Sequence, residues 1–401
     1  MHNDVVMLST ADWDNPFWTN KQHVAVELAR RGYRIFYVES VGLRRPSASA
    51  QDIRRIAKRI FKALQPPRQV RPHLWVWSPA VIPLHRNTIA RWINRALLSL
   101  GLKFWLGMLG IRRKVLWTYN PMTSQLLSLA SFETIIYHCV DDVKVQPGMP
   151  REEIERSESE LVSRANFCFV TSEYLLESCR KLNAQTYYFP NVADFTHFSK
   201  ALDPSIALPA DLAEVSRPII GFVGAISAYK LDFELLKKLA QGNPEWSVVL
   251  IGKVGEGDPQ TDIGELRLIS NLHFVGPRRY EDLPAYLKAF SVAILPNVLN
   301  EYTRSMFPMK FLEYLAAGKP VVATNLPALQ AFRKFTWLAK DTDGFIAAIA
   351  AALRGEGASL EARLELAKGQ TYELRTERML QLLRGAGGFD GISIDREKIL
   401  Q

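Results

Sequence analysis

The stretch MFPMKFLEYLAAGKPVVAT, residues 306–324, decides the fold because it holds a turn, a helix and a buried strand. Pro308 suits the first turn of a helix, where its missing N–H costs little. Residues 310–317 are mostly good helix formers. Gly318 suits the position just after a helix, and the apolar run Val321–Thr324 predicts a short buried strand. This order of helix, turn and strand is typical of an α/β fold.

The same stretch places two charged side chains at the start of its helix. Lys310 lies in the first turn, and Glu313 follows three residues later on the same face. Unpaired N–H groups and the helix dipole attract phosphate there. A lysine can neutralise a diphosphate, and a carboxylate can accept hydrogen bonds from both hydroxyls of a ribose. The alternative is a surface ion pair worth about 0.2–0.5 kcal/mol.

The whole string resembles the donor-binding block of GT-B glycosyltransferases, close to the family-4 type. The resemblance implies that Glu313 holds the ribose of a nucleotide diphosphate sugar, which we expect to be UDP-linked. The family-4 pattern has a second glutamate eight residues earlier, where this chain has Ser305. The pair Met309 and Lys310 also resembles the xanthan-type glucuronosyltransferases, so both residues are predicted to contact the donor.

Short apolar runs alternate with helical patterns along both halves of the chain, which predicts parallel, helix-flanked sheets. We therefore expect two doubly wound, Rossmann-like domains that face each other across a cleft. The predicted boundaries are residues 1–198 for an acceptor-side domain, 199–217 for a linker, 218–383 for a nucleotide-sugar-binding domain and 384–401 for a weakly ordered tail. The predicted strands are Val5–Leu8, Ile35–Val38, Leu74–Trp77, Val115–Thr118, Thr134–Cys139, Phe167–Val170, Thr186–Phe189, Ile219–Val223, Ser247–Ile251, His273–Val275, Val292–Leu295, Val321–Ala323 and Thr336–Leu338.

The composition is that of an ordinary globular protein, with 48% hydrophobic and 23% charged residues. The first residues show no signal-peptide pattern, and the longest apolar tract is too short to span a membrane. The three cysteines have no metal-ligand spacing and are expected to be buried thiols in a reducing compartment. No metal site and no bound cofactor are predicted. The expected location is the cytoplasm.

The net charge of +9 is concentrated in one region, because residues 53–132 contain no Asp or Glu. Its first part has apolar residues at helical spacing with a basic opposite face. Three interpretations compete: an anionic membrane surface, a nucleic acid, or a solvated helix face. We favour a peripheral position on the inner face of the plasma membrane, because no nucleic-acid motif is present. The membrane-facing residues would be Arg54, Arg55, Lys58 and Arg59.

Two loops after predicted strands are further candidates for donor binding. Gly224 ends the strand Ile219–Val223, and small residues there let backbone approach a phosphate. Lys230 follows and is a candidate for the diphosphate, although it is also compatible with a solvated lysine before a helix. By the family resemblance, the loop commonly carries an arginine as well, where this chain has Ala225. The loop at Gly276 resembles the loop that flanks the nucleobase.

The strand Thr134–Cys139 runs into two acids, and ligands in open α/β sheets sit at the carboxyl ends of strands. Asp141 is our first candidate for the base that deprotonates an acceptor hydroxyl, and Asp142 is the second. Adjacent residues point in different directions, so at most one of the two is central; both also suit a turn or a helix cap. His138 is a third candidate, though it is also compatible with a satisfied interior histidine.

Trp18 lies in a loop that resembles the acceptor-side loop of the superfamily, and its ring could stack on a sugar. A hydrophobic staple beside a helix cap is the alternative. Together these features predict a metal-independent glycosyltransferase that acts on a saccharide or lipid-linked acceptor in envelope or exopolysaccharide synthesis. A nucleotide-sugar epimerase of the same fold and a non-catalytic sugar-nucleotide-binding partner are the alternatives.

Overall fold

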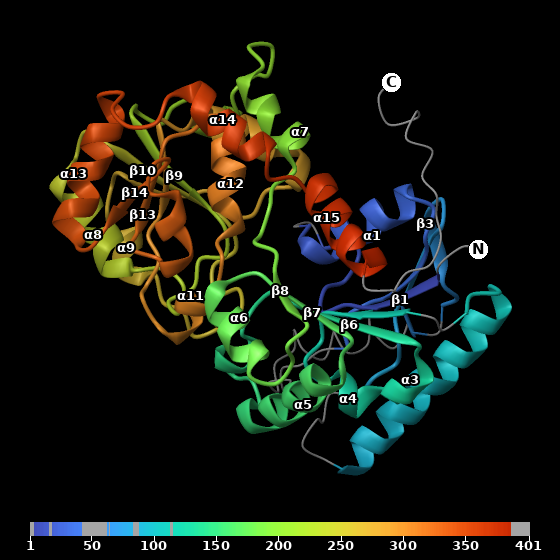
Figure 1. Cartoon of the computed structure of the whole chain (residues 1–401). Helices are drawn as coiled ribbons and strands as arrows, with labels where there is room; N and C mark the ends of the chain where they lie inside the picture. Colours follow the sequence, from blue (N-terminus) through green and yellow to red (C-terminus); the bar gives the residue numbers. More distant parts are fainter. Residues whose placement is uncertain are drawn as a thin grey trace.

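The computed structural model describes residues 4–15, 18–41, 62–63, 65–82, 88–112 and 115–385. They form two α/β domains, each built on one sheet with helices on both faces (Figure 1). This confirms the predicted fold class.

The first sheet has eight strands in the order β3-β4-β2-β1-β5-β6-β7-β8. All its neighbouring strands are parallel except β3 and β4. Its strands are β1 (Asp4–Leu8), β2 (Arg34–Val38), β3 (Arg68–Arg71), β4 (Leu74–Trp77), β5 (Val115–Thr118), β6 (Thr134–Cys139), β7 (Phe167–Val170) and β8 (Thr186–Tyr188). The helices with it are α1 (Asn20–Arg30), α3 (Thr88–Met108), α4 (Thr123–Leu126), α5 (Arg151–Arg164) and α6 (Glu173–Arg180), with short 3-10 turns η1 (Leu129–Ser131) and η2 (Val143–Val145).

The second sheet has six parallel strands in the order β11-β10-β9-β12-β13-β14. Its strands are β9 (Ile219–Val223), β10 (Ser247–Ile251), β11 (Leu272–Phe274), β12 (Val292–Leu295), β13 (Val321–Thr324) and β14 (Trp337–Ala339). The helices of this half are α7 (Phe195–Phe198), α8 (Phe233–Gly242), α9 (Gly264–Arg267), α10 (Leu283–Ala289), α11 (Glu301–Ser305), α12 (Met309–Ala316), α13 (Thr342–Leu353), α14 (Leu360–Lys368) and α15 (Tyr372–Gly385). Its 3-10 turns are η3 (Ser199–Leu202), η4 (Ala210–Leu212), η5 (Tyr280–Asp282) and η6 (Pro327–Phe332).

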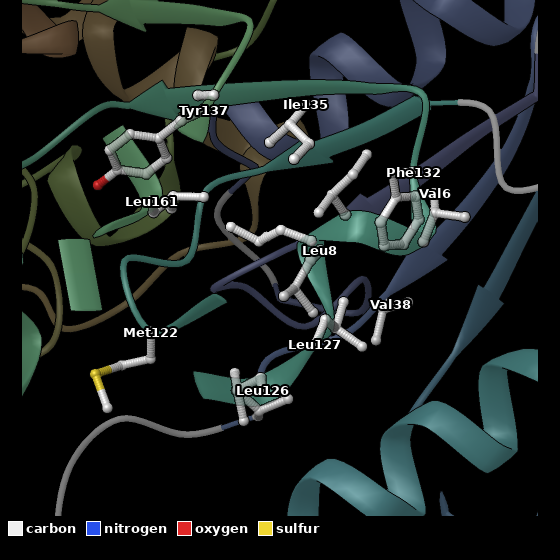
Figure 2. Packing of buried hydrophobic residues seen from close by; sticks show 14 of the residues in the cluster. Val6, Leu8, Val38, Met122, Leu126, Leu127, Phe132, Ile135, Tyr137 and Leu161 are labelled. Carbon is white, nitrogen blue, oxygen red and sulfur yellow. The ribbon is translucent and has the colours of Figure 1, made fainter. Parts of the chain in front are cut away.

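Strand β1 shows how each sheet separates two apolar layers. Val6 and Leu8 belong to one buried cluster, whereas Val5 and Met7 belong to the cluster on the opposite face. Figure 2 shows the first cluster, in which Leu8 lies among side chains from several elements. Since successive side chains of a strand point to opposite faces, a strand that is apolar throughout must be covered on both sides.

The fold-deciding stretch forms the elements that the sequence predicts. Helix α12 starts after Pro308 and is followed by Gly318, whose φ is +75°. The N–H of Gly318 donates to the carbonyl of Leu315, and the N–H of Lys319 donates to that of Tyr314. These two bonds are a Schellman motif, which ends the helix and turns the chain into β13.

The chain crosses between the domains twice, at neighbouring positions. Ala193 pairs with Thr371 in an isolated parallel bridge. Ala201 and Leu212 lie in the core of the second domain, so the segment 199–217 packs there instead of spanning the gap as a linker. Helix α15 packs against α1 of the first domain, beside it in Figure 1. Residues 372–383 thus belong by contact to the first domain, and residues 386–401 of the expected tail lie outside the described part.

Candidate active site

The two domains contact each other around helix α11 and the entry to α12. The hydroxyl of Ser172 donates to the carbonyl of Ser305 at 2.6 Å. The side-chain amide of Asn191 donates to the carbonyl of Phe307, also at 2.6 Å. The N-terminus of α12 is therefore held against the first domain by two side chains.

Lys310, in the first turn of α12, forms an ion pair with Glu313, which follows three residues later. The Lys310 Nζ lies 2.5 Å from Glu313 Oε2, and the exposed fractions of the two side chains are 24% and 5%. Within the described residues, Lys310 is the partner that bonds the Glu313 carboxylate. The pair combines a reachable cation with a buried, fixed carboxylate, as a diphosphate and an adjoining ribose would need. Met309 precedes the pair as the first residue of the helix.

Two stacked pairs of aromatic rings lie near this ion pair. His197 stacks on Tyr280, with ring centroids 4.2 Å apart, and His23 of α1 stacks on Tyr372 at 4.0 Å. His23 and Tyr280 are 6.1 Å apart, so the two stacks adjoin across the domains. Burial lowers the pKa of His23 to about 3, and the nearby cations Arg375 and Lys310 add to this effect. His23 is therefore neutral at physiological pH.

Three glycines lie at the carboxyl ends of three adjacent strands of the second sheet. Gly224 follows β9, Gly252 follows β10 and Gly276 follows β11 after one residue. The N–H of Gly252 donates to the carbonyl of Gly276 at 3.0 Å. A Cβ on Gly252 would lie 1.7 Å from the carbonyl oxygen of Gly224, so a side chain does not fit there. The predicted residues Gly224 and Gly276 thus lie on one edge of the second sheet, where ligands of α/β sheets bind.

Lys230 lies in the loop before α8 and is held by its backbone. Its carbonyl accepts from the N–H of Val298 and from the side chain of Asn297, both at 3.0 Å. Its Nζ lies 5.2 Å from the ring centre of Tyr229 and 5.5 Å from that of Tyr302. These cation–π contacts point the ammonium toward α11, on the side that meets the first domain.

Asp141 follows β6 and faces the second domain. The Tyr302 hydroxyl donates to its Oδ1 across the domain boundary at 3.5 Å, a long hydrogen bond. Burial raises the pKa of Asp141, while Lys21, Lys230 and the Tyr302 bond oppose that rise. Burial lowers the pKa of Lys21, and Asp141 partly offsets this. Asp141 is thus a carboxylate flanked by cations from both domains, an environment suited to a general base.

Asp142 points into the first domain instead. It is buried, and its Oδ1 lies 3.0 Å from the Nζ of Lys144. Lys144 also reaches Glu158 at 3.5 Å, and Glu158 accepts a hydrogen bond from Tyr137 at 2.5 Å. As adjacency predicts, the two aspartates diverge, and Asp142 takes part in an internal network of the first domain.

His138 lies beneath the cleft surface. Its exposed fraction is 0%, and its ring packs among those of Trp117, Tyr119 and Phe169. Burial lowers its pKa well below the ordinary value, and Arg375 and Lys21 lower it further. Both ring nitrogens lack a hydrogen-bond partner among the described residues. His138 is therefore a neutral interior histidine, and this placement corrects its assignment as a candidate base.

Trp18 is half-buried just before α1. Its ring centroid lies 5.3 Å from Trp13 and 5.4 Å from His23, and the Arg71 guanidinium lies 5.8 Å from its centre. Through His23, Trp18 adjoins the rings that reach the second domain. Arg54, Arg55, Lys58 and Arg59 lie outside the described residues.

A buried network of hydrogen bonds connects the two segments that cross between the domains with α1 and α12. The Arg375 guanidinium donates to Asn20 at 2.7 Å and to the carbonyl of Pro190 at 3.2 Å. Asn20 donates to Asn191 at 2.8 Å, and Asn191 donates to Phe307. Helix α12 is therefore connected through hydrogen bonds to α1, which carries Lys21 and His23.

At two positions this chain lacks the charged residues of the family-4 pattern. Ser305 is fully buried, and its hydroxyl donates to the carbonyl of Tyr302 within α11 at 2.7 Å. Ala225 has no charged group. Of the charged residues that the resemblance implies for donor binding, this chain therefore has Lys310, Glu313 and Lys230.

Two surface hollows of the described part lie away from these residues. One, of about 480 Å³, lies beside β11, and the other, of about 500 Å³, lies between η4 and α10. Both lie at the edge of the second domain and share Asp211. We place the site by its charged and backbone groups instead. No group of three or more His, Cys, Asp or Glu residues that could hold a metal occurs in the described ranges.

The sequence patterns do not point to Lys21, His23 or Tyr302 as residues near the candidate site. Lys21 and His23 lie at the start of α1, directly after the loop that carries Trp18, so that loop was the available signal. Tyr302 lies in a segment with no motif, and only the contact between domains shows its relation to Asp141.

Comparisons with known proteins find a matching family and relatives for part of the chain. Residues 217–355 match the family described as Glycosyl transferases group 1. TuaH of Bacillus subtilis, named as a teichuronic acid biosynthesis glycosyltransferase, is 31% identical over 238 residues, which are 55% of this chain and 58% of TuaH. The chain thus aligns with less than two thirds of that relative.

Solved structures share the whole fold. Sucrose-phosphate synthase from Thermosynechococcus elongatus has a TM-score of 0.68 and 19% identity, with coverage of 96% of this chain and 99% of that one. Anabaena HepE, solved with UDP and glucose, has a TM-score of 0.64 and 14% identity, with coverage of 96% and 100%. Residues 217–355 thus match the Glycosyl transferases group 1 family, in a chain with the GT-B fold.

Proposed function

We propose that this protein is a glycosyltransferase that transfers a sugar from a nucleotide diphosphate sugar, a UDP-sugar, to a hydroxyl of a saccharide or lipid-linked acceptor. The observation that carries the proposal is the Lys310–Glu313 ion pair near the start of α12, inside the region that matches the group 1 family. Two side chains of the first domain hold this helix end against that domain, from which the candidate base comes.

The donor would lie along the carboxyl edge of the second sheet. Glu313 would accept hydrogen bonds from the ribose hydroxyls, and the backbone at Gly224 and Gly276 would approach the diphosphate and the nucleobase. Lys310, Lys230 and the N-terminus of α12 would stabilise the negative charge that develops on the leaving diphosphate. We propose that these groups serve without a metal ion. The sequence has two Asp-x-Asp triplets, at residues 12–14 and 341–343, but Asp14 forms an ion pair with Arg68 and Asp341 caps α13.

The acceptor would enter from the first domain. Its hydroxyl oxygen forms a bond to the anomeric carbon while the bond from that carbon to the diphosphate oxygen breaks. Asp141 takes the hydroxyl proton, and Trp18 contacts the acceptor sugar. The raised pKa of Asp141 makes this carboxylate a stronger base than an exposed aspartate.

The relatives support the donor and the pathway class. TuaH is named for teichuronic acid biosynthesis, and HepE was solved with UDP-glucose. We propose a role in envelope or exopolysaccharide synthesis at the inner face of the plasma membrane. The acid-free basic region of the sequence, which includes Arg54, Arg55, Lys58 and Arg59, would lie against anionic lipid.

Product analysis with radiolabelled UDP-sugars and a lipid extract tests the proposal. Transfer of label to an acceptor supports it. An epimer of the free donor without transfer would identify an epimerase and overturn it. Donor binding by calorimetry with neither product would point to a non-catalytic binding partner.

A further inference from the structure

The outward face of α3 carries large apolar side chains along its length. Ile89, Trp92, Leu100, Phe104 and Met108 have exposed fractions of 70%, 71%, 65%, 58% and 71%. Their spacing puts them on one side of the helix. From residue 89 to residue 108 the stripe is about 28 Å long. Exposed apolar surfaces of this size mark sites that contact another protein or a membrane.

The opposite face of α3 fixes the helix on the first domain. Leu98, Leu102 and Leu106 are buried in the same cluster as Trp77 of β4. A Cβ on Gly101 would lie 2.5 Å from the Trp77 ring, so the helix is seated closely. The exposed stripe therefore belongs to a rigid element of the fold, and the inner face cannot rotate outward without loss of this packing.

The charged residues of α3 and of the sequence that flanks it all have one sign. Arg95, Lys103 and Arg112 are exposed, and the sequence has no acidic residue from Ile53 to Phe132. A two-fold pairing of two copies through α3 would bring these cations together, which is unfavourable. A surface with negative headgroups over an apolar interior complements both the cations and the stripe.

We propose that α3 lies flat in the surface of an anionic phospholipid membrane, with Trp92, Leu100 and Phe104 inserted among the acyl chains. The stripe runs along the side of the helix, so the helix lies parallel to the membrane plane. None of the described helices is long and apolar enough to cross a membrane. Figure 1 shows α3 on the outer side of the first domain, away from the second domain.

This inference rests on the proposed function in one respect: a lipid-linked acceptor gives the anchoring its purpose. Lipid held at α3 would keep the first domain, which carries Asp141 and Trp18, at the surface that contains the acceptor. The second domain would remain free to bind the soluble donor.

A cysteine-labelling experiment on the full chain tests the inference. The native cysteines at 139, 168 and 179 are buried, so a new exposed cysteine can be labelled selectively with an environment-sensitive fluorophore. Leu100→Cys places the dye in the stripe. Leu268→Cys, at a position that is 85% exposed in the second domain, is the matched control. Vesicles that contain phosphatidylglycerol are compared with pure phosphatidylcholine vesicles at low and high ionic strength.

We expect a blue shift and a gain in intensity for Leu100→Cys with anionic vesicles, and no change for Leu268→Cys. The double variant Trp92→Ser/Phe104→Ser should lower vesicle partitioning by about tenfold or more. It should still bind UDP-sugar, since neither residue lies at the candidate site.

Binding of anionic vesicles without a dye response at Leu100→Cys would overturn the inference, as would no vesicle binding. Self-association of the wild type that the double variant abolishes, without lipid binding, would assign the stripe to a second copy. Failure of sugar transfer with intact insertion would count against the proposed function alone.

Discussion

The ammonium of Lys310 lies 2.5 Å from a carboxylate oxygen of Glu313, three residues later near the start of α12. Exposed lysine–glutamate pairs on a helix contribute little to stability, about 0.2–0.5 kcal/mol. This pair differs because Glu313 is almost fully buried, and its helix end is held by Asn191 of the first domain. Both charges are thus fixed in place before a donor arrives, which reduces the entropy cost of binding.

Neutral replacements of this pair should weaken donor binding. Glu313→Gln and Lys310→Met should each raise the Kd for a UDP-sugar at least tenfold, which corresponds to about 1.4 kcal/mol. Isothermal calorimetry measures the Kd. The control is Lys237→Met, which breaks a comparable 2.6 Å pair with Glu265 on the surface of the second domain. An unchanged Kd in both site variants would remove α12 from the donor site.

The two adjacent aspartates should give different phenotypes. Asp141→Asn removes the proposed base, so kcat should fall by about 10²–10⁴-fold while donor affinity stays within a few-fold. Asp142→Asn removes the partner of Lys144, so its main effect should be a loss of about 1–3 kcal/mol in the free energy of unfolding. Steady-state kinetics and urea denaturation separate these effects. A larger fall of kcat in Asp142→Asn than in Asp141→Asn would reverse the assignment.

Removal of the Tyr302 hydroxyl should shift the pH dependence of the reaction. The base must be ionised, so activity falls as the pH drops through the pKa of Asp141. Because the Tyr302 hydrogen bond lowers this raised pKa, Tyr302→Phe should move the acid limb of kcat/KM to higher pH. Tyr229→Phe is the control, since it keeps the ring that contacts Tyr302 and leaves the hydrogen bond from Tyr302 to Asp141 in place. An acid limb at the wild-type position in Tyr302→Phe would show that this bond does not tune the base.

Local pattern predicts the parts of this fold that local forces determine. The strand Val321–Thr324 and the turn at Gly318 follow from an apolar run and from a residue that tolerates positive φ. Strand β3, Arg68–Arg71, escapes the pattern because Val70 is its one apolar residue and because it is mostly exposed at the sheet edge. Helix α15 is not predictable as a part of the first domain, because its position depends on contacts with α1 far away in the sequence.

The candidate site was predictable where the chemistry lies in one segment, and not where it lies between segments. Lys310 and Glu313 share one helical turn, so their spacing suffices. The direction of His138 depends on which face of β6 lies inward, and both faces of a buried parallel strand are apolar. Likewise, only the packing of the two domains brings Tyr302 to Asp141.

His138 should make the stability of the protein depend on pH. Its imidazole is neutral in the folded state because burial lowers its pKa well below that of the unfolded chain, about 6.5. Below pH 6.5 the unfolded state therefore binds a proton that the folded state does not, and the free energy of unfolding falls as the pH falls. Between pH 7.5 and pH 5.5 this single group accounts for a loss of about 1.4 kcal/mol.

His138→Phe should remove this contribution. Since the ring already packs among Trp117, Tyr119 and Phe169, a phenylalanine suits its surroundings and leaves no unpaired ring nitrogen. Urea denaturation of the variant should show a smaller loss between the two pH values, by about 1.4 kcal/mol. At pH 8, where the histidine is neutral in both states, its stability should equal or exceed that of the wild type. Equal pH dependence in the two proteins would mean that His138 reaches solvent or a hydrogen-bonding partner in the folded state, and it would restore this residue as a candidate for the base.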